Sequence, residues 1–152
     1  MLLESIEILI VEDDTGDVEL IKESLKMSKF KMVINHVLDG HEYMEYLRMQ
    51  GKYKTAKKPD VVLLDLNLPK KDGRQVLMEM KTDPMLKKIP VVILTTSDNE
   101  VDINKTYELG ANCFVTKPVD FDQIKKIVNE IVDFWFAVVK LPADAVKAKE
   151  ET

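Results

Sequence analysis

The chain contains very little cysteine, since Cys113 is the only one. A single thiol cannot form an internal disulfide, which favours a reducing compartment and a role for Cys113 as core filler. The N-terminus lacks a basic region followed by a cleavage site, so it does not read as a secretory signal. The most apolar late stretch, 131–141, is too short to span a membrane and contains Asp133 and Lys140. We therefore expect a cytoplasmic protein that makes no use of membranes.

An excess of basic charge is also lacking. The sequence has 22 Lys and Arg against 27 Asp and Glu, a net charge of −5, which disfavours a nucleic-acid-binding protein because such affinity rests on cationic contacts to phosphate. Its 152 residues, 45% of them hydrophobic, suffice for one globular domain with a real core. We expect that domain to cover residues 1–140. The rest, 141–152, reads as a short, charged, Ala-rich tail, and we expect a stand-alone domain with no output domain after it.

Short apolar runs alternate with helical patterns along the whole chain. Strands are predicted at 6–11, 32–37, 61–64, 89–94 and 111–115, and helices at 18–29, 43–51, 76–83, 99–109 and 122–139. Five short apolar strands separated by helices indicate a parallel sheet covered on both faces, with right-handed crossovers. The predicted fold class is therefore α/β: a doubly wound, five-stranded parallel sheet in the flavodoxin-like strand order.

Asp65 ends the most apolar of these strands, in the stretch VVLLDLNLPKKDG at 61–73. In open α/β sheets, ligand sites lie outside the carboxyl ends of the strands. A structural alternative is that Asp65 caps a helix, as Asp often does. Pro69 and Gly73 argue against a helix that starts at once, so a site at Asp65 is the preferred interpretation.

Polar residues end the other strands as well. They are Glu12, Asp13, Thr95 and Lys117, with Asp14 as a further candidate, and parallel strands bring them to one edge. Several carboxylates cannot share a small site without repulsion, and ligation by oxygen alone points to Mg²⁺ or Mn²⁺. A lysine and a threonine hydroxyl suit phosphoryl oxygens. The set predicts phosphoryl transfer onto Asp65, although each residue alone has an ordinary structural explanation.

The segments ILIVEDD, VVLLDLNLPKKDG, VVILTTS and GANCFVTKPVD, in this order and spacing, resemble the receiver domain of two-component response regulators across about residues 5–139. The resemblance implies a stand-alone, non-enzymatic regulator that accepts a phosphoryl group from a sensor histidine kinase. The similarity extends to small regulators partnered with bacteriophytochrome kinases. It implies that Asp65 is the phosphoacceptor and that Glu12, Asp13, Asp65 and the backbone carbonyl of Asn67 bind the metal. Thr95 would be the switch hydroxyl, Lys117 the partner of the phosphoryl group and Phe114 the switch aromatic. Pro118 would follow a cis peptide bond.

Two other functions use similar residues. A Mg²⁺-dependent phosphatase with an aspartyl nucleophile needs a second Asp two residues later as general acid, and Asn67 occupies that position. A pseudo-receiver would bind partners without ever being phosphorylated, but every expected site residue is present. Both remain alternatives to the receiver.

The last predicted helix carries more apolar residues than one face can hold. Ile124, Ile127, Val128, Ile131, Trp135 and Val138 follow helical spacing and should pack on the sheet. Val132, Phe134, Phe136 and Val139 then point away from the core. The preferred interpretation is a homodimer interface with Phe134 and Phe136 as anchors; the alternative is that the chain's own tail covers this surface.

Overall fold

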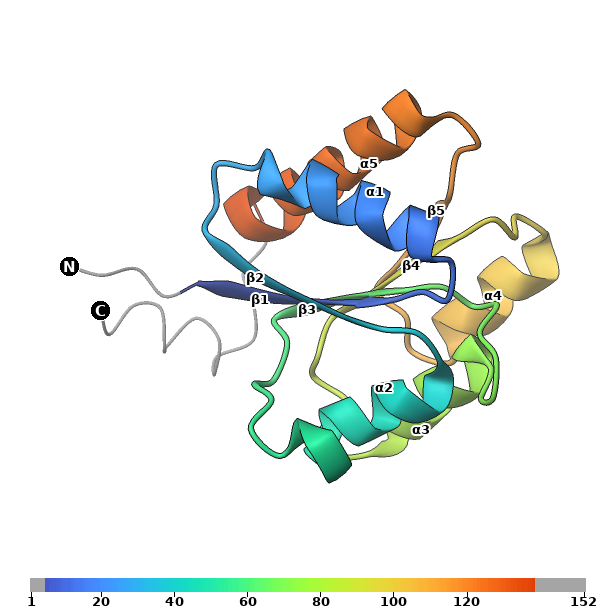
Figure 1. The fold of residues 1–152 in the computed structure, drawn as a ribbon. Coiled ribbons are helices and arrows are strands. Elements are labelled where there is room, and N and C mark those ends of the chain that lie inside the picture. Colours follow the sequence, from blue (N-terminus) through green and yellow to red (C-terminus); the bar gives the residue numbers. More distant parts are fainter. Residues whose placement is uncertain (1–4, 139–152) are drawn as a thin grey trace.

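The computed structural model describes residues 5–138, which form one parallel sheet covered by helices on both faces (Figure 1). The strand order is β2-β1-β3-β4-β5, so the predicted flavodoxin-like fold is confirmed. The strands are β1 (Ile6–Val11), β2 (Met32–Val37), β3 (Val61–Leu64), β4 (Val91–Thr95) and β5 (Cys113–Thr116). The helices are α1 (Thr15–Lys26), α2 (Gly40–Leu47), α3 (Gly73–Thr82), α4 (Glu100–Glu108) and α5 (Phe121–Asp133), with a 3₁₀ turn at η1 (Gly51–Tyr53) and a π-helical turn at η2 (Phe134–Val138).

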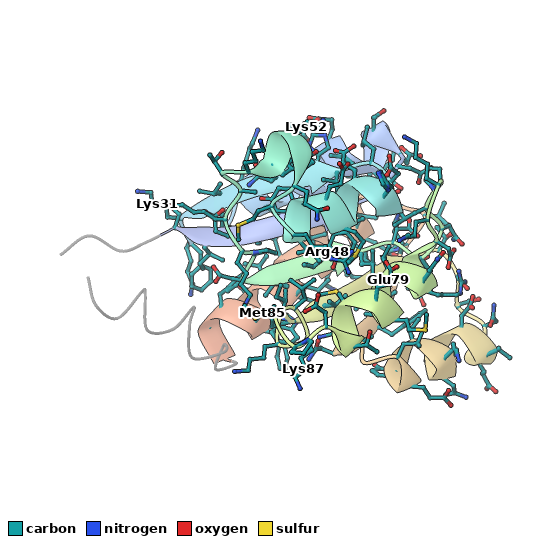
Figure 2. The ribbon with its side chains drawn as sticks, turned by 90° about the horizontal axis from the view of Figure 1, so that it is seen from below. Lys31, Arg48, Lys52, Glu79, Met85 and Lys87 are labelled. Carbon is teal, nitrogen blue, oxygen red and sulfur yellow. The ribbon has the colours of Figure 1, made fainter. Side chains whose placement is uncertain are left out.

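Two apolar clusters lie on the two faces of the sheet. α1 and α5 cover one face and α2 and α3 cover the other, as Figure 1 shows. Every residue of β3 and β4 is buried, as expected of central strands between two helical layers. Figure 2 looks onto the layer formed by α2 and α3, with Arg48 after α2 and Glu79 on α3. Among residues 5–138, no helix is both long and apolar enough to cross a membrane.

Several element boundaries differ from the predicted ones because polar side chains set them. α1 begins at Thr15 rather than at residue 18, since the Asp14 carboxylate accepts the backbone N–H of Asp17 and caps the helix. β4 begins at Val91, and the Asn112 side chain accepts the Val91 N–H before β5 starts. Hydrophobic periodicity carries no information about such caps.

The end of α5 corrects the prediction of one regular helix to residue 139. The α-helix ends at Asp133 and a π-helical turn follows, which changes the rotation per residue. Val132 is buried in the core rather than pointing away from it. Phe136 is half-buried, and its ring contacts Phe30 edge-on with the centroids 5.9 Å apart. Among Val132, Phe134 and Phe136, which were predicted to point away from the core, only Phe134 is exposed, at 52%. Val139 and the 141–152 tail lie outside the described residues.

α4 is held mainly by polar contacts. Its only buried residue is Thr106. At its first turn, Asp102 accepts hydrogen bonds from the Arg74 Nε of α3 at 2.9 Å and from the Ser97 hydroxyl at 2.5 Å. At its last turn, the Tyr107 hydroxyl accepts the backbone N–H of Phe114 in β5 at 3.1 Å. α4 is therefore fixed at both ends to neighbouring elements, with little apolar burial between them.

Candidate functional site

The predicted residues do meet at the carboxyl edge of the sheet. Asp65 follows β3, and each of its oxygens is engaged. Oδ1 accepts the Thr95 hydroxyl of β4 at 2.8 Å and the backbone N–H of Asn67 at 2.9 Å. Oδ2 lies 3.1 Å from the Nζ of Lys117, which follows β5. Residues from three separate strand ends thus converge on one carboxylate.

These contacts keep Asp65 ionised. Burial by itself raises the pKa of its carboxyl, but the Asn67 N–H, the Lys117 charge and the Thr95 hydroxyl outweigh burial and hold the pKa below the ordinary value. A carboxylate that stays charged in a residue only 6% exposed overall is available as a nucleophile at neutral pH.

Lys117 lies in the middle of the site rather than at its rim. Its Nζ pairs with a Glu12 oxygen, with Asp65, and with Asp17 Oδ2 at 3.0 Å. Burial by itself lowers the pKa of this ammonium, but the bonds and charges of the three carboxylates prevail and raise it. Asp17, on the first turn of α1, was missed by the sequence reasoning, which considered only residues at strand ends.

Glu12 is also buried, at 3% exposure. Besides pairing with Lys117, it accepts the backbone N–H of Asp14 at 3.1 Å. Burial, helped by the charge of Asp65, raises the pKa of Glu12 to about 7, although Lys117 opposes the shift. In this structure Glu12, which was predicted as a metal ligand, is paired with Lys117.

Asp13 and Asn67 lie at the exposed side of the same edge. Within residues 5–138, no three His, Cys, Asp or Glu side chains stand ready-made around a single point. The buried carboxylates instead surround the Lys117 ammonium. The donor set nonetheless fits a hard cation, because Asp13, Asp65 and the Asn67 carbonyl offer oxygen ligands only.

The loop after Asp65 is packed so tightly that two glycines are required. A Cβ on Gly73 would lie 2.6 Å from the backbone oxygen of Asp65, and one on Gly40 would lie 1.9 Å from the backbone oxygen of Lys71. Lys70 has a positive φ of 66°, the left-handed region. The N-termini of α2 and α3 therefore clamp the loop that presents Asp65.

The two remaining predicted residues differ in outcome. Phe114 is half-buried and packs against the cluster on the α2 and α3 side. The bond before Pro118 is trans, like every peptide bond within residues 5–138, so the prediction of a cis bond is wrong in this structure. A cis bond is not needed to direct Lys117 toward Asp65, because the trans chain already places Nζ 3.1 Å from it.

A carboxylate at the end of the central strand, flanked by a hydroxyl and a lysine from the next two strand ends, is the arrangement that the sequence motifs led us to expect. Residues 8–129 match the response regulator receiver domain. The chain belongs to this family. It is 48% identical over 136 residues to response regulator Rcp1 of Synechocystis sp., covering 90% of this chain and 92% of Rcp1.

Two crystal structures of receivers are close to this one. The phosphorylated cyanobacterial phytochrome response regulator RcpA superposes with a TM-score of 0.89 at 49% identity, covering 91% of this chain and 99% of RcpA. The Mn²⁺-bound form of Rcp1 has a TM-score of 0.86 at 47% identity, covering 90% and 99%. The receiver fold and the membership of the response regulators thus agree in sequence and in structure.

Proposed function

We propose that this receiver accepts a phosphoryl group on Asp65 and signals through the resulting change in its protein contacts. The observation that carries the proposal is the Asp65 carboxylate, buried yet charged, with Thr95 and Lys117 placed to pair with added oxygens. One Asp65 oxygen attacks the phosphorus, the bond from phosphorus to the donor group breaks, and the donor leaves with its electron pair. The Lys117 ammonium offsets the added charge.

The site also suits a divalent cation, Mg²⁺ or Mn²⁺. Asp13, Asp65 and the backbone carbonyl of Asn67 would hold it, with Glu12 contributing through water. The Mn²⁺-bound form of the similar Rcp1 supports binding of a divalent cation by a receiver of this kind. The bound cation supplies positive charge to the transferring oxygens. Asp13 is exposed, so its carboxylate can bind such a cation without first leaving a buried partner.

The proposed phosphodonor is a sensor histidine kinase of the phytochrome type. The support is the similarity to RcpA, which is a phytochrome response regulator, at nearly half of all aligned positions. A receiver of this kind transmits a signal rather than turning over a metabolite, because the covalent product is the modified protein itself.

The test is labelling with acetyl phosphate in the presence of Mg²⁺, followed by intact-mass measurement. The wild type should gain one phosphoryl group, Asp65→Asn should gain none, and Asp98→Asn, a matched change at an exposed loop position, should label like the wild type. Hydrolysis of many phosphoesters without a stable adduct would indicate the phosphatase. No adduct on the folded wild type would indicate a pseudo-receiver.

We further propose that the receiver forms a homodimer through the end of α5. Phe134 supports this because it is 52% exposed beside the buried Trp135, with its ring edge-on to that side chain at 6.0 Å. Phe136 contributes less than its spacing predicts, since it also packs on Phe30. Sedimentation should show a wild-type dimer and a Phe134→Ser monomer, with Phe121→Ser, which changes an exposed aromatic at the start of α5, as control. A monomeric wild type, with and without phosphorylation, would refute the dimer.

A further inference from the structure

Asp17 has an unusual contact for its position. It is the third residue of α1, where an acidic side chain ordinarily turns back to the N–H of the capping residue. Here the capping residue is Asp14, and its N–H donates instead to Glu12 Oε2 at 3.1 Å. The Asp17 carboxylate crosses to Lys117, 100 residues away in the sequence, at 3.0 Å. Helix capping therefore does not explain where Asp17 points.

The three partners of Lys117 differ in how easily they can be given up. An ammonium has three N–H donors, and the three carboxylates of Glu12, Asp17 and Asp65 match that number. The side chains of Lys117 and Glu12 are 4% exposed and that of Asp65 is 8% exposed, whereas Asp17 is 26% exposed. Water can replace Lys117 at Asp17 at the least cost, because the other two carboxylates are desolvated.

We propose that Asp17 is a positioning residue that holds the Lys117 ammonium toward α1 and restrains its transfer to a phosphoryl group on Asp65. This proposal rests on the proposed function of Asp65. Lys117 already donates to Asp65, and this donor can pass to a phosphoryl oxygen once the Asp65 carboxylate is esterified, but the ammonium must move toward the added group to make the contact. The bond to Asp17, the most exposed of the three partners, is the one that opposes this movement. The strength of that bond then sets how readily the site accepts and retains the phosphoryl group.

The bond between Asp17 and Lys117, here called the tether, should affect the labelling rate in one direction. Removing the Asp17 charge frees Lys117 for the developing phosphoryl charge and should speed labelling. Since a partly exposed ion pair contributes about 1 kcal/mol or less, the expected gain is at most about fivefold in the initial rate. Asp17→Glu keeps a carboxylate that can still reach Lys117, so this variant should be labelled at the wild-type rate to within about a factor of two.

The experiment measures initial labelling by acetyl phosphate with Mg²⁺ in the folded, full-length chain. The variants are Asp17→Asn, Asp17→Glu and Glu23→Gln, the last removing an exposed charge from the same helix. Each is also made together with Lys117→Gln, which forms a double-mutant cycle. Labelling of the slow Lys117→Gln series is followed over longer incubations, and thermal unfolding of each variant confirms that it is folded.

The proposal predicts faster labelling for Asp17→Asn alone, and no such gain when Lys117 is already replaced. The proposal is wrong if Asp17→Asn also speeds labelling in the Lys117→Gln background, or if Glu23→Gln speeds labelling equally. Either result would mean that Asp17 acts only through its charge. A wild-type rate in Asp17→Asn would overturn the proposal as well. A wild type that is not labelled on Asp65 at all would instead refute the proposed function, so the two failures are distinguishable.

Discussion

The attachment of α4 can be tested by one nearly isosteric change, Asp102→Asn. Asp102 binds Arg74 through two nitrogens, Nε at 2.9 Å and Nη2 at 2.8 Å, and also accepts from Ser97 and from the Asn99 amide. The same helix buries only Thr106. Loss of the Asp102 charge should therefore release α4 far more than it destabilises the rest of the fold.

The size of the effect follows from burial. The Asp102 and Arg74 side chains are 17% and 29% exposed, between the fully buried and the exposed case. Two-point contacts between Arg and a carboxylate are stronger than single ones, while solvent screening reduces exposed pairs to about 1 kcal/mol or less. We expect about 1–2 kcal/mol for local opening of α4, which corresponds to roughly a 5- to 30-fold increase in amide exchange.

Hydrogen exchange measured by mass spectrometry is the direct assay. Peptides covering α4 should exchange faster in Asp102→Asn, while those covering β3 and α1 should not change. Glu100→Gln is the matched control, because it also removes an acidic side chain from the first turn of α4 but has an exposed position. The reasoning is wrong if α4 exchanges at the wild-type rate in Asp102→Asn, or equally fast in both variants.

The same contact predicts a dependence on pH. Hydrogen bonds from Arg74 and then Ser97 lower the pKa of Asp102 to about 2 from the model-compound value of 3.8. A carboxyl group whose pKa is lower in the folded than in the unfolded state stabilises the fold fully when the pH is above the unfolded-state pKa. This stabilisation is lost as the pH falls through the folded-state pKa. The difference in free energy of unfolding between wild type and Asp102→Asn should accordingly shrink between about pH 4 and pH 2, as acid titrations in denaturant can show.

Three further predictions concern the phosphoryl site. Thr95→Ala should still be labelled on Asp65, but the label should no longer alter amide exchange in α4 and β5, because the buried hydroxyl that bonds Asp65 is gone; equal responses in variant and wild type would refute the coupling. Asp13→Ala should weaken Mg²⁺ binding, measured by calorimetry, and should slow labelling, whereas metal-dependent labelling at the wild-type rate would remove Asp13 from the ligands. Gly73→Ala should destabilise the fold by about 1–3 kcal/mol in urea unfolding because its Cβ meets backbone 2.6 Å away, and an unchanged midpoint would show that the loop can yield.

The sheet and the strand-end residues could be predicted because both depend on short local patterns. Unbroken runs such as those of β3 and β4 indicate strands buried on both faces. Once parallel strands are expected, the polar residue after each strand must lie at one edge, which brought Asp65, Thr95 and Lys117 together. Topology thus carried the site prediction, with no knowledge of side-chain contacts.

The contacts that escaped prediction depend on geometry between distant elements. Asp17 on a helix and Lys117 after a strand meet only because the long Lys117 side chain reaches from the end of the outer strand β5 to the first turn of α1. Arg74 and Asp102 join two helices across a loop, and neither has a spacing signal. Near the end of α5, Val132 is four residues after the buried Val128, so regular helical spacing already places it on the core stripe, and the prediction assigned it to the wrong face. Phe136 follows the start of a π-helical turn, which shifts side chains around the axis in a way that a regular helical wheel does not describe.

The hydrogen bond from the Phe114 N–H to the Tyr107 hydroxyl lies at an outer edge of the sheet. β5 is an outer strand of the sheet, and the backbone donors of such a strand can pair with a strand from another molecule. Tyr107 engages one of these donors from the side, in the middle of a strand of four residues. If α4 is released, as expected for Asp102→Asn, this donor loses its partner, and we expect that variant to be more prone to edge-to-edge aggregation than the wild type.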